Sequence, residues 1–147
     1  MDITIVIVSF RVKHFLEQTI RSAQEALKGL SGEIIVVDNN SADDTMPYVK
    51  PKFPSVTFIE NGGFPRANNQ AIMQAKGTYT LILNPDTIIT PECLRKCLEW
   101  MAQHPHCGAI GLHMIDGNGQ FLPESKRAFP TPWVSFCKIF GLSKLFP

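Results

Sequence analysis

Hydrophobic and polar positions alternate between a strand-like and a helix-like pattern over the first 110 residues. Apolar runs predict four strands, at residues 3–8, 33–37, 56–59 and 79–83, and the first run, which is β-branched throughout, predicts a strand buried on both faces. Between the first two runs, apolar residues recur at spacings of three and four, which predicts one helix over residues 14–28. The order strand, helix, strand indicates a parallel sheet covered by helices.

Local signals place the remaining elements. Ser41-Ala42-Asp43-Asp44 resembles a capping box and predicts a short helix after it. Pro65 and Gly77 bracket a helix over residues 66–76, and Thr90 followed by Pro91 predicts the start of another. A fifth strand is expected over residues 109–115, followed by a hairpin-type turn over residues 116–119.

These elements together predict a three-layer α/β/α sandwich with a mostly parallel sheet. We expect one domain over residues 1–130. Residues 131–147 form an apolar tail, rich in aromatic side chains, which we expect to lead into an acceptor region that this chain lacks. A membrane-surface helix is the alternative interpretation of that tail.

Polar groups follow each of the four buried strands. These groups are Ser9-Phe10-Arg11, Asp38-Asn39-Asn40-Ser41, Glu60-Asn61-Gly62-Gly63 and Asn84-Pro85-Asp86-Thr87. Each segment taken alone is also typical of an ordinary turn. Because the carboxyl ends of parallel strands meet at one edge of a sheet, the four together predict a crevice for a ligand with many hydrogen-bonding groups.

Composition and charge narrow the function classes. Lys plus Arg is 14 and Asp plus Glu is 13, so the net charge of +1 provides no general attraction to nucleic acid. Four cysteines among 147 residues are too few for a disulfide scaffold and favour a reduced, cytoplasmic protein. No G-x-G-x-x-G follows the first strand and no P-loop is present, which excludes two common nucleotide-binding motifs.

Several motifs resemble the inverting family 2 glycosyltransferases, most of all the rhamnosyltransferase-like branch. The similarity runs from about residue 3 to about residue 130 and is carried by Val36-Val37-Asp38-Asn39-Asn40-Ser41, Asn61-Gly62-Gly63-Phe64, Ala67-Asn68-Asn69-Gln70 and Asn84-Pro85-Asp86-Thr87. The resemblance implies a GT-A fold. It also implies transfer of a sugar from a UDP- or dTDP-linked donor to a glycan or lipid-linked acceptor, at the inner face of the membrane if the acceptor is lipid-linked.

The resemblance also implies the site residues. Those implied for donor binding are Ser9, Asp38, Asn40, Asn61, Gly62, Asn68, Asn69 and Asn84. Asp86 falls on the family's D-x-D motif, whose first acid is Asn84 here, and is the expected ligand of Mg²⁺ or Mn²⁺.

The general base that inversion requires is expected beyond residue 147, so this chain is expected to be the donor-binding half of a longer enzyme. Glu124 is the best candidate within the chain. Arg66 and Lys126-Arg127 are possible partners of the diphosphate.

Two other functions remain open at this point. The chain is alternatively a non-catalytic nucleotide-sugar-binding module, or an unrelated α/β interaction domain. A zinc site at Cys93, Cys97 and the nearby histidines is a weaker alternative, because no C-x-x-C pair is present.

Overall fold

The computed structural model describes residues 1–60, 66–122 and 125. The chain divides into two compact units, Met1–His104 and Pro105–Pro147. The elements of the first unit are β1 (Ile3–Ser9), α1 (Lys13–Ala26), β2 (Gly32–Asp38), α2 (Thr45–Val49), the 3₁₀ helix η1 (Lys50–Lys52), β3 (Thr57–Glu60), α3 (Arg66–Ile72), β4 (Tyr79–Leu83) and α4 (Pro91–Gln103).

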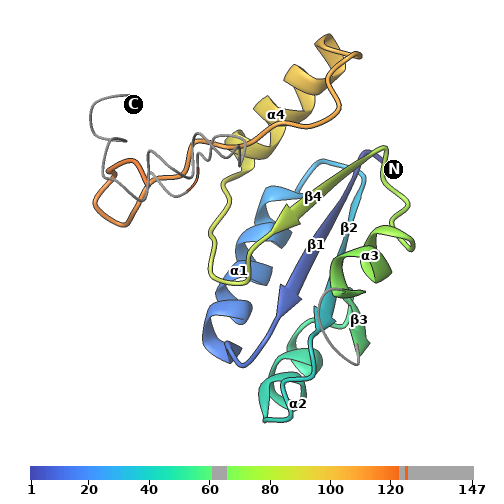
Figure 1. Ribbon diagram of the computed structural model, residues 1–147, viewed down its shortest axis with the longest axis vertical. Helices are drawn as coiled ribbons and strands as arrows, with labels where there is room; N and C mark the ends of the chain where they lie inside the picture. Colours follow the sequence, from blue (N-terminus) through green and yellow to red (C-terminus); the bar gives the residue numbers. More distant parts are fainter. Residues whose placement is uncertain (61–65, 123–124, 126–147) are drawn as a thin grey trace, which may run out of the picture. The chain divides into compact units, whose positions relative to one another are not determined.

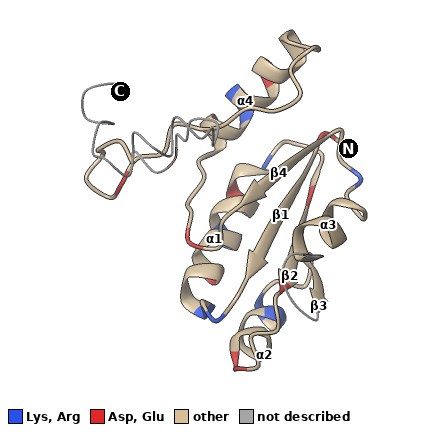
Figure 2. Ribbon diagram, in the orientation of Figure 1, with Lys and Arg blue, Asp and Glu red and all other residues tan. Residues whose placement is uncertain are grey.

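The four strands form one parallel sheet in the order β3-β2-β1-β4, which confirms the predicted sheet (Figure 1). Strand β1 is central and carries no charged residue, whereas the charges of β2 lie near its ends, at Glu33 and Asp38 (Figure 2). Apolar strand interiors with charges confined to the ends are what a sheet covered on both faces requires.

Two separate cores lie on the two faces of the sheet. Because successive side chains of a strand point to opposite faces, Ile5 and Ile7 of β1 pack with Leu16 and Ile20 of α1. Val6 of β1 packs on the other face, in a smaller core whose remaining buried members are Ile35, Val37, Ala67 and Ala71. Helices on both faces make the three layers that the sequence predicts.

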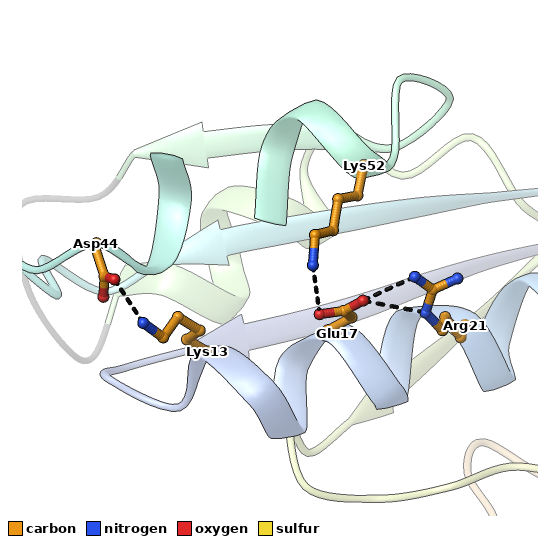
Figure 3. Close-up of polar contacts among 5 residues, drawn as sticks. All are labelled: Lys13, Glu17, Arg21, Asp44 and Lys52. Atoms are coloured by element: carbon orange, nitrogen blue, oxygen red, sulfur yellow. Dashed lines mark hydrogen bonds and ion pairs between the residues drawn. The ribbon is translucent and has the colours of Figure 1, made fainter. Parts of the chain in front are cut away.

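Ion pairs connect α1 to the segment that follows β2. Glu17 of α1 accepts from Lys52 of η1 at 2.8 Å and from Arg21 Nη2 at 2.7 Å (Figure 3). Lys13, at the start of α1, pairs with Asp44. The cluster holds the chain after β2 against α1, so the loops after β1 and β2 are held near each other.

Three sequence predictions for local structure are wrong. Ser41 does not cap α2: its hydroxyl donates to Asp38, and α2 begins at Thr45. Helix α3 ends at Ile72 instead of residue 76, because the backbone N–H groups of Lys76 and Gly77 donate to the Thr4 hydroxyl, which draws the chain toward β1.

The third correction is the expected strand at residues 109–115. In the described part of the second unit, pairing there is limited to a single antiparallel bridge between Ile115 and Phe121. Apolar residues form a strand only where a neighbouring strand accepts their backbone hydrogen bonds. The predicted turn at residues 116–119 is confirmed, since Gly119 N donates to Asp116 O at 3.0 Å.

The predicted start of α4 is confirmed as well. The Thr90 hydroxyl accepts from Cys93 N at 3.3 Å and Pro91 occupies the first helical position. Helices in the described ranges are all too short or too polar to cross a bilayer. The predicted domain boundary at residue 130 lies outside the described residues and remains a prediction.

Candidate functional site

The carboxyl ends of the parallel strands lie at one edge of the sheet, as the sequence predicts. Ser9 of β1 is in register with Asp38 of β2, and Asp38 is in register with Glu60 of β3. Strand β4 ends at Leu83, on the other side of β1. Polar residues from segments far apart in the sequence are therefore gathered at the edge where ligands bind in open α/β sheets.

A pocket of about 310 Å³ opens at this edge. It is bounded by the end of β1, the residue after β2, helix α3 and the end of β4, and its lining residues are Val8, Ser9, Phe10, Asn39, Asn68, Ile82, Leu83, Asn84 and Pro85. The wall is apolar with a few polar groups, which is the usual character of a small-molecule site.

Three of the polar atoms in this lining have no hydrogen-bond partner among the described residues. They are Ser9 Oγ, Asn39 Oδ1 and Asn68 Oδ1, and all three are buried. A buried polar atom left without a partner costs about 1–3 kcal/mol, so such atoms are rare in structural positions. The two amide oxygens accept hydrogen bonds and the Ser9 hydroxyl accepts or donates one, so the pocket suits a ligand that supplies N–H or O–H donors.

Asp38 lies beside this pocket and is held by Ser41. The Ser41 backbone N–H donates to Asp38 Oδ2 at 3.2 Å, and the Ser41 hydroxyl donates to Asp38 Oδ1. The hydroxyl oxygen also accepts from Arg11 N at 3.1 Å, and Arg11 Nε donates to the Ser41 carbonyl at 2.9 Å. The loops after β1 and β2 are therefore joined through one serine.

These two loops contain the three non-glycine residues of positive φ in the described part of the chain, Arg11 (54°), Asn40 (61°) and Ala42 (50°). A left-handed backbone costs of order 1 kcal/mol or more for residues such as arginine and alanine, and is better tolerated by asparagine. Such strain persists only where surrounding contacts maintain it, and the hydrogen bonds of Ser41 supply those contacts here.

The segment after β4 forms a turn. Thr87 N donates to Asn84 O at 3.2 Å, which closes a four-residue turn with Pro85 in its second position. Asn84 lines the pocket, while Asp86 is exposed and is not part of the lining. The turn thus places an exposed carboxylate one residue after Pro85, which lines the pocket.

The donor set of this turn fits a divalent cation shared with a ligand. Groups of three or more His, Cys, Asp or Glu in metal-binding geometry do not occur among the described residues. Asp86 and Asn84 offer hard oxygen atoms, and Mg²⁺ is commonly held by one or two carboxylates together with substrate phosphates. The residues present therefore suit a metal that binds together with a diphosphate.

The structure separates the predicted donor-binding residues into groups. Ser9, Asn68 and Asn84 line the pocket, Asp38 is buried beside it, and Asn40 and Asn69 are exposed outside it. Other predicted residues lie outside the described residues: Asn61, Gly62, Glu124, the side chain of Arg66, and Lys126-Arg127. The roles of all of these residues remain predictions.

Sequence reasoning missed Asn39, Phe10 and Ile82 as pocket residues. A signal for Asn39 was available, since residues of a strand alternate between faces. Val37 packs on the α3 side, and Asn39 follows it by two residues. Counting this period past the end of β2 selects Asn39 instead of Asn40.

Comparison with known proteins gives relatives for nearly the whole chain. The sequence is 30% identical over 102 residues to succinoglycan biosynthesis protein ExoO of Rhizobium meliloti, covering 67% of this chain and 29% of that protein. It is 25% identical over 143 residues to poly(ribitol-phosphate) β-N-acetylglucosaminyltransferase TarS of Staphylococcus aureus, covering 92% of this chain and 25% of TarS. The chain thus spans less than a third of the length of either relative.

Solved structures share the fold. The crystal structure of Staphylococcus aureus TarS with UDP superposes with a TM-score of 0.62 at 19% identity, covering 71% of this chain and 33% of that one. The mannosyltransferase PcManGT from Pyrobaculum calidifontis, in complex with GDP-Man and Mn²⁺, gives 0.58 at 20% identity, with 74% and 33% covered. These likenesses show the α/β fold of the GT-A type.

The sequence model of Glycosyl transferase family 2 matches residues 4–144. That range includes β1 from its second residue onward, the other three strands, the pocket at their carboxyl ends and the turn that carries Asp86. The chain therefore belongs to glycosyl transferase family 2.

Proposed function

We propose that this chain binds the nucleoside diphosphate of a sugar donor, and that it is the donor-binding part of an inverting glycosyltransferase. The observation that carries the proposal is a set of three buried polar atoms around one pocket, Ser9 Oγ, Asn39 Oδ1 and Asn68 Oδ1, for which the described part of the chain provides no hydrogen-bond partner. A nucleoside supplies matching donors in its base N–H and ribose hydroxyl groups. Solved TarS complexes with UDP and with UDP-GlcNAc support a uridine nucleotide as the first candidate.

In this proposal the polar residues hold and orient the nucleoside. An ionised carboxylate has about four acceptor positions, of which Ser41 occupies two on Asp38. The remaining positions of Asp38 accept from an imide N–H or from a ribose hydroxyl. Val8 and Ile82 supply an apolar surface against which the bound base packs.

Asp86, together with Asn84, would hold the divalent cation against the diphosphate. A bound Mg²⁺ or Mn²⁺ supplies Lewis-acid stabilisation of the negative charge that grows on the leaving diphosphate. PcManGT was solved with Mn²⁺, which supports manganese as the test ion. The general base is proposed to lie beyond residue 147, in the part of the longer relatives that this chain does not match.

The acceptor and the branch of the family belong to the proposal as well. TarS acts on poly(ribitol-phosphate) and ExoO takes part in succinoglycan biosynthesis, which supports an acceptor of the polysaccharide class. A rhamnosyltransferase-like specificity rests on the motifs Asn61-Gly62-Gly63-Phe64 and Asn84-Pro85-Asp86-Thr87. We place the reaction in the cytoplasm, at the membrane if the acceptor is lipid-linked.

Isothermal titration tests this function. UDP, dTDP and GDP are titrated into the 147-residue chain with Mn²⁺ and with EDTA. We expect one diphosphate to bind, more tightly with Mn²⁺, and Asp86→Ala to lose the gain that Mn²⁺ provides while keeping the metal-free affinity.

Each result of the titration has a defined meaning. No binding of any nucleotide, with or without metal, would contradict the proposal and favour an α/β interaction domain. A chain that binds nucleotide but transfers no sugar, even when the proposed acceptor region beyond residue 147 is added, would favour a non-catalytic module.

A further inference from the structure

Thr19 makes a hydrogen bond that connects α1 to the turn carrying Asp86. Its side chain is 1% exposed, in the middle of α1. Thr19 Oγ1 donates to the carbonyl oxygen of Pro85 at 2.8 Å, across 66 residues of sequence. A threonine within a helix commonly bonds a carbonyl of its own preceding turn, so a bond to another element points to a role in positioning that element.

The carbonyl that Thr19 binds belongs to the central peptide of the turn. The turn runs from Asn84 to Thr87 and is closed by Thr87 N donating to Asn84 O at 3.2 Å. The orientation of the central peptide is what distinguishes type I from type II turns, and proline fits the second position of both. Proline therefore does not select the orientation; Asp86 in the third position disfavours type II, and the Thr19 hydrogen bond adds a contact that holds the type I orientation.

The orientation of that peptide sets the backbone of Asp86. A type II turn requires a positive φ at its third position, which is Asp86. Asp86 is not among the positive-φ residues of the described chain, so the turn has the other orientation. A flip of the central peptide would turn the Pro85 carbonyl away from Thr19 and redirect the Asp86 side chain.

A second hydroxyl of α1 holds the far end of the same segment. Ser22 Oγ accepts from Ile89 N at 3.3 Å and donates to the Thr19 carbonyl at 2.9 Å. The side chain of Ile89 is buried in the core. The segment is thus fixed at Pro85 and at Ile89, with Asp86 and Ile88 exposed between them.

We propose that Thr19 is a positioning residue that locks the turn and thereby sets the direction of the Asp86 carboxylate. The importance of that direction for a metal-bound diphosphate rests on the proposed function. The lock itself, meaning the hydrogen bond by which Thr19 holds the turn, does not. Thr19 acts through the backbone of the turn.

The test removes the hydroxyl without changing the side-chain volume. Thr19→Val is compared with Thr19→Ser, which keeps the donor, and with Thr4→Val as the matched control. Thr4 is also a buried threonine, but its hydroxyl bonds Glu33, Lys76 and Gly77 at the amino end of the sheet. NMR of the ligand-free chain measures the Asp86 amide-to-Hα coupling, which depends on φ, and calorimetry measures UDP binding with Mn²⁺ and with EDTA.

We expect Thr19→Val to change the Asp86 coupling and to reduce the affinity gain from Mn²⁺ by roughly tenfold, with the EDTA affinity unchanged. Thr19→Ser should retain the wild-type values, and Thr4→Val should lower stability without altering the Mn²⁺ gain. If Thr19→Val does not fold, Thr19→Ala removes the same donor and gives the same two readouts.

Three results test this inference, and the first two separate it from the proposed function. An unchanged Asp86 coupling in Thr19→Val overturns the lock, whether or not the chain binds nucleotides. A changed coupling in a chain whose wild type gains nothing from Mn²⁺ supports the lock and contradicts the proposed role of Asp86. An equal Mn²⁺ gain in wild type and Thr19→Val contradicts the positioning role.

Discussion

Ser41 donates two hydrogen bonds to Asp38, one from its backbone N–H and one from its hydroxyl, at the carboxyl end of β2. The same hydroxyl oxygen accepts from the backbone of Arg11, so the carboxylate and the loop after β1 depend on one side chain. Asp38 is nearly buried, and a buried carboxylate requires donors of this kind.

Ser41→Ala should therefore destabilise the chain by about 2 kcal/mol, because it removes a hydrogen bond to a buried charged group. It also removes the acceptor of the Arg11 N–H, so UDP affinity should fall as well. Urea unfolding and calorimetry measure the two effects. Ser31→Ala, at an exposed position outside the site, serves as the control, and a Ser41→Ala variant as stable as that control would contradict this account.

Asn68→Leu should separate binding from stability. Asn68 Oδ1 is buried with no partner among the described residues, which lowers the stability of the folded chain. Leucine is of similar size and has no polar atom, so Asn68→Leu removes this penalty. We expect stability to rise by about 1 kcal/mol while nucleotide affinity falls at least about tenfold, the opposite signs that are typical of a binding-site residue.

Gln74→Ala, at an exposed position just beyond α3, is the control for Asn68→Leu and should keep the wild-type affinity. Undiminished UDP binding by Asn68→Leu would exclude this pocket as the nucleoside site.

Gly77→Ala should destabilise the chain by about 2–3 kcal/mol. A Cβ at this position would overlap backbone atoms of Ile3 and Thr4, which cannot move without disturbing the central strand. Gly108→Ala is the matched control, since a Cβ there meets nothing within 4 Å. Equal urea midpoints for the two variants would show that the approach of residue 77 to β1 is looser than described.

Glu17 should make stability depend on pH in the acid range. Hydrogen bonds from Lys52, Arg21 and Tyr48 lower the pKa of Glu17 from 4.5 to about 2. Because the folded-state pKa lies below the unfolded one, the stabilisation is complete above about pH 4.5. It is lost as the pH falls toward 2.

Unfolding midpoints measured from pH 7 to pH 2.5 test this. Glu17→Gln should be less stable than wild type at pH 7 and should show a shallower loss below pH 4.5, so that the two curves converge in acid. The surface pair Glu92 and Lys96 provides a control, since Glu92→Gln removes only an exposed i,i+4 interaction. Parallel curves for wild type and Glu17→Gln would contradict the predicted coupling.

The sequence alone predicts the architecture because its signals are local. Apolar runs at β1 and β2, and the three-to-four spacing from Leu16 to Leu27, are read from near neighbours and require no knowledge of the fold. The same patterns place Ser9, Asp38 and Asn84 at one sheet edge, because the carboxyl ends of parallel strands share an edge.

Only the tertiary structure decided which side chains at that edge enter the pocket and which hydrogen bonds they make. Ser41 resembles a helix cap in sequence but binds Asp38. Residues 109–115 have the pattern of a strand, but within the described ranges they pair only through the bridge of Ile115 to Phe121. Asn39 and Asn68 enter the pocket while Asn40 and Asn69 do not. The direction of a side chain beyond a strand end depends on left-handed backbone positions, such as those of Arg11 and Ala42, and on hydrogen bonds across tens of residues, such as Thr19 to Pro85. Neither feature has a local signature in the sequence.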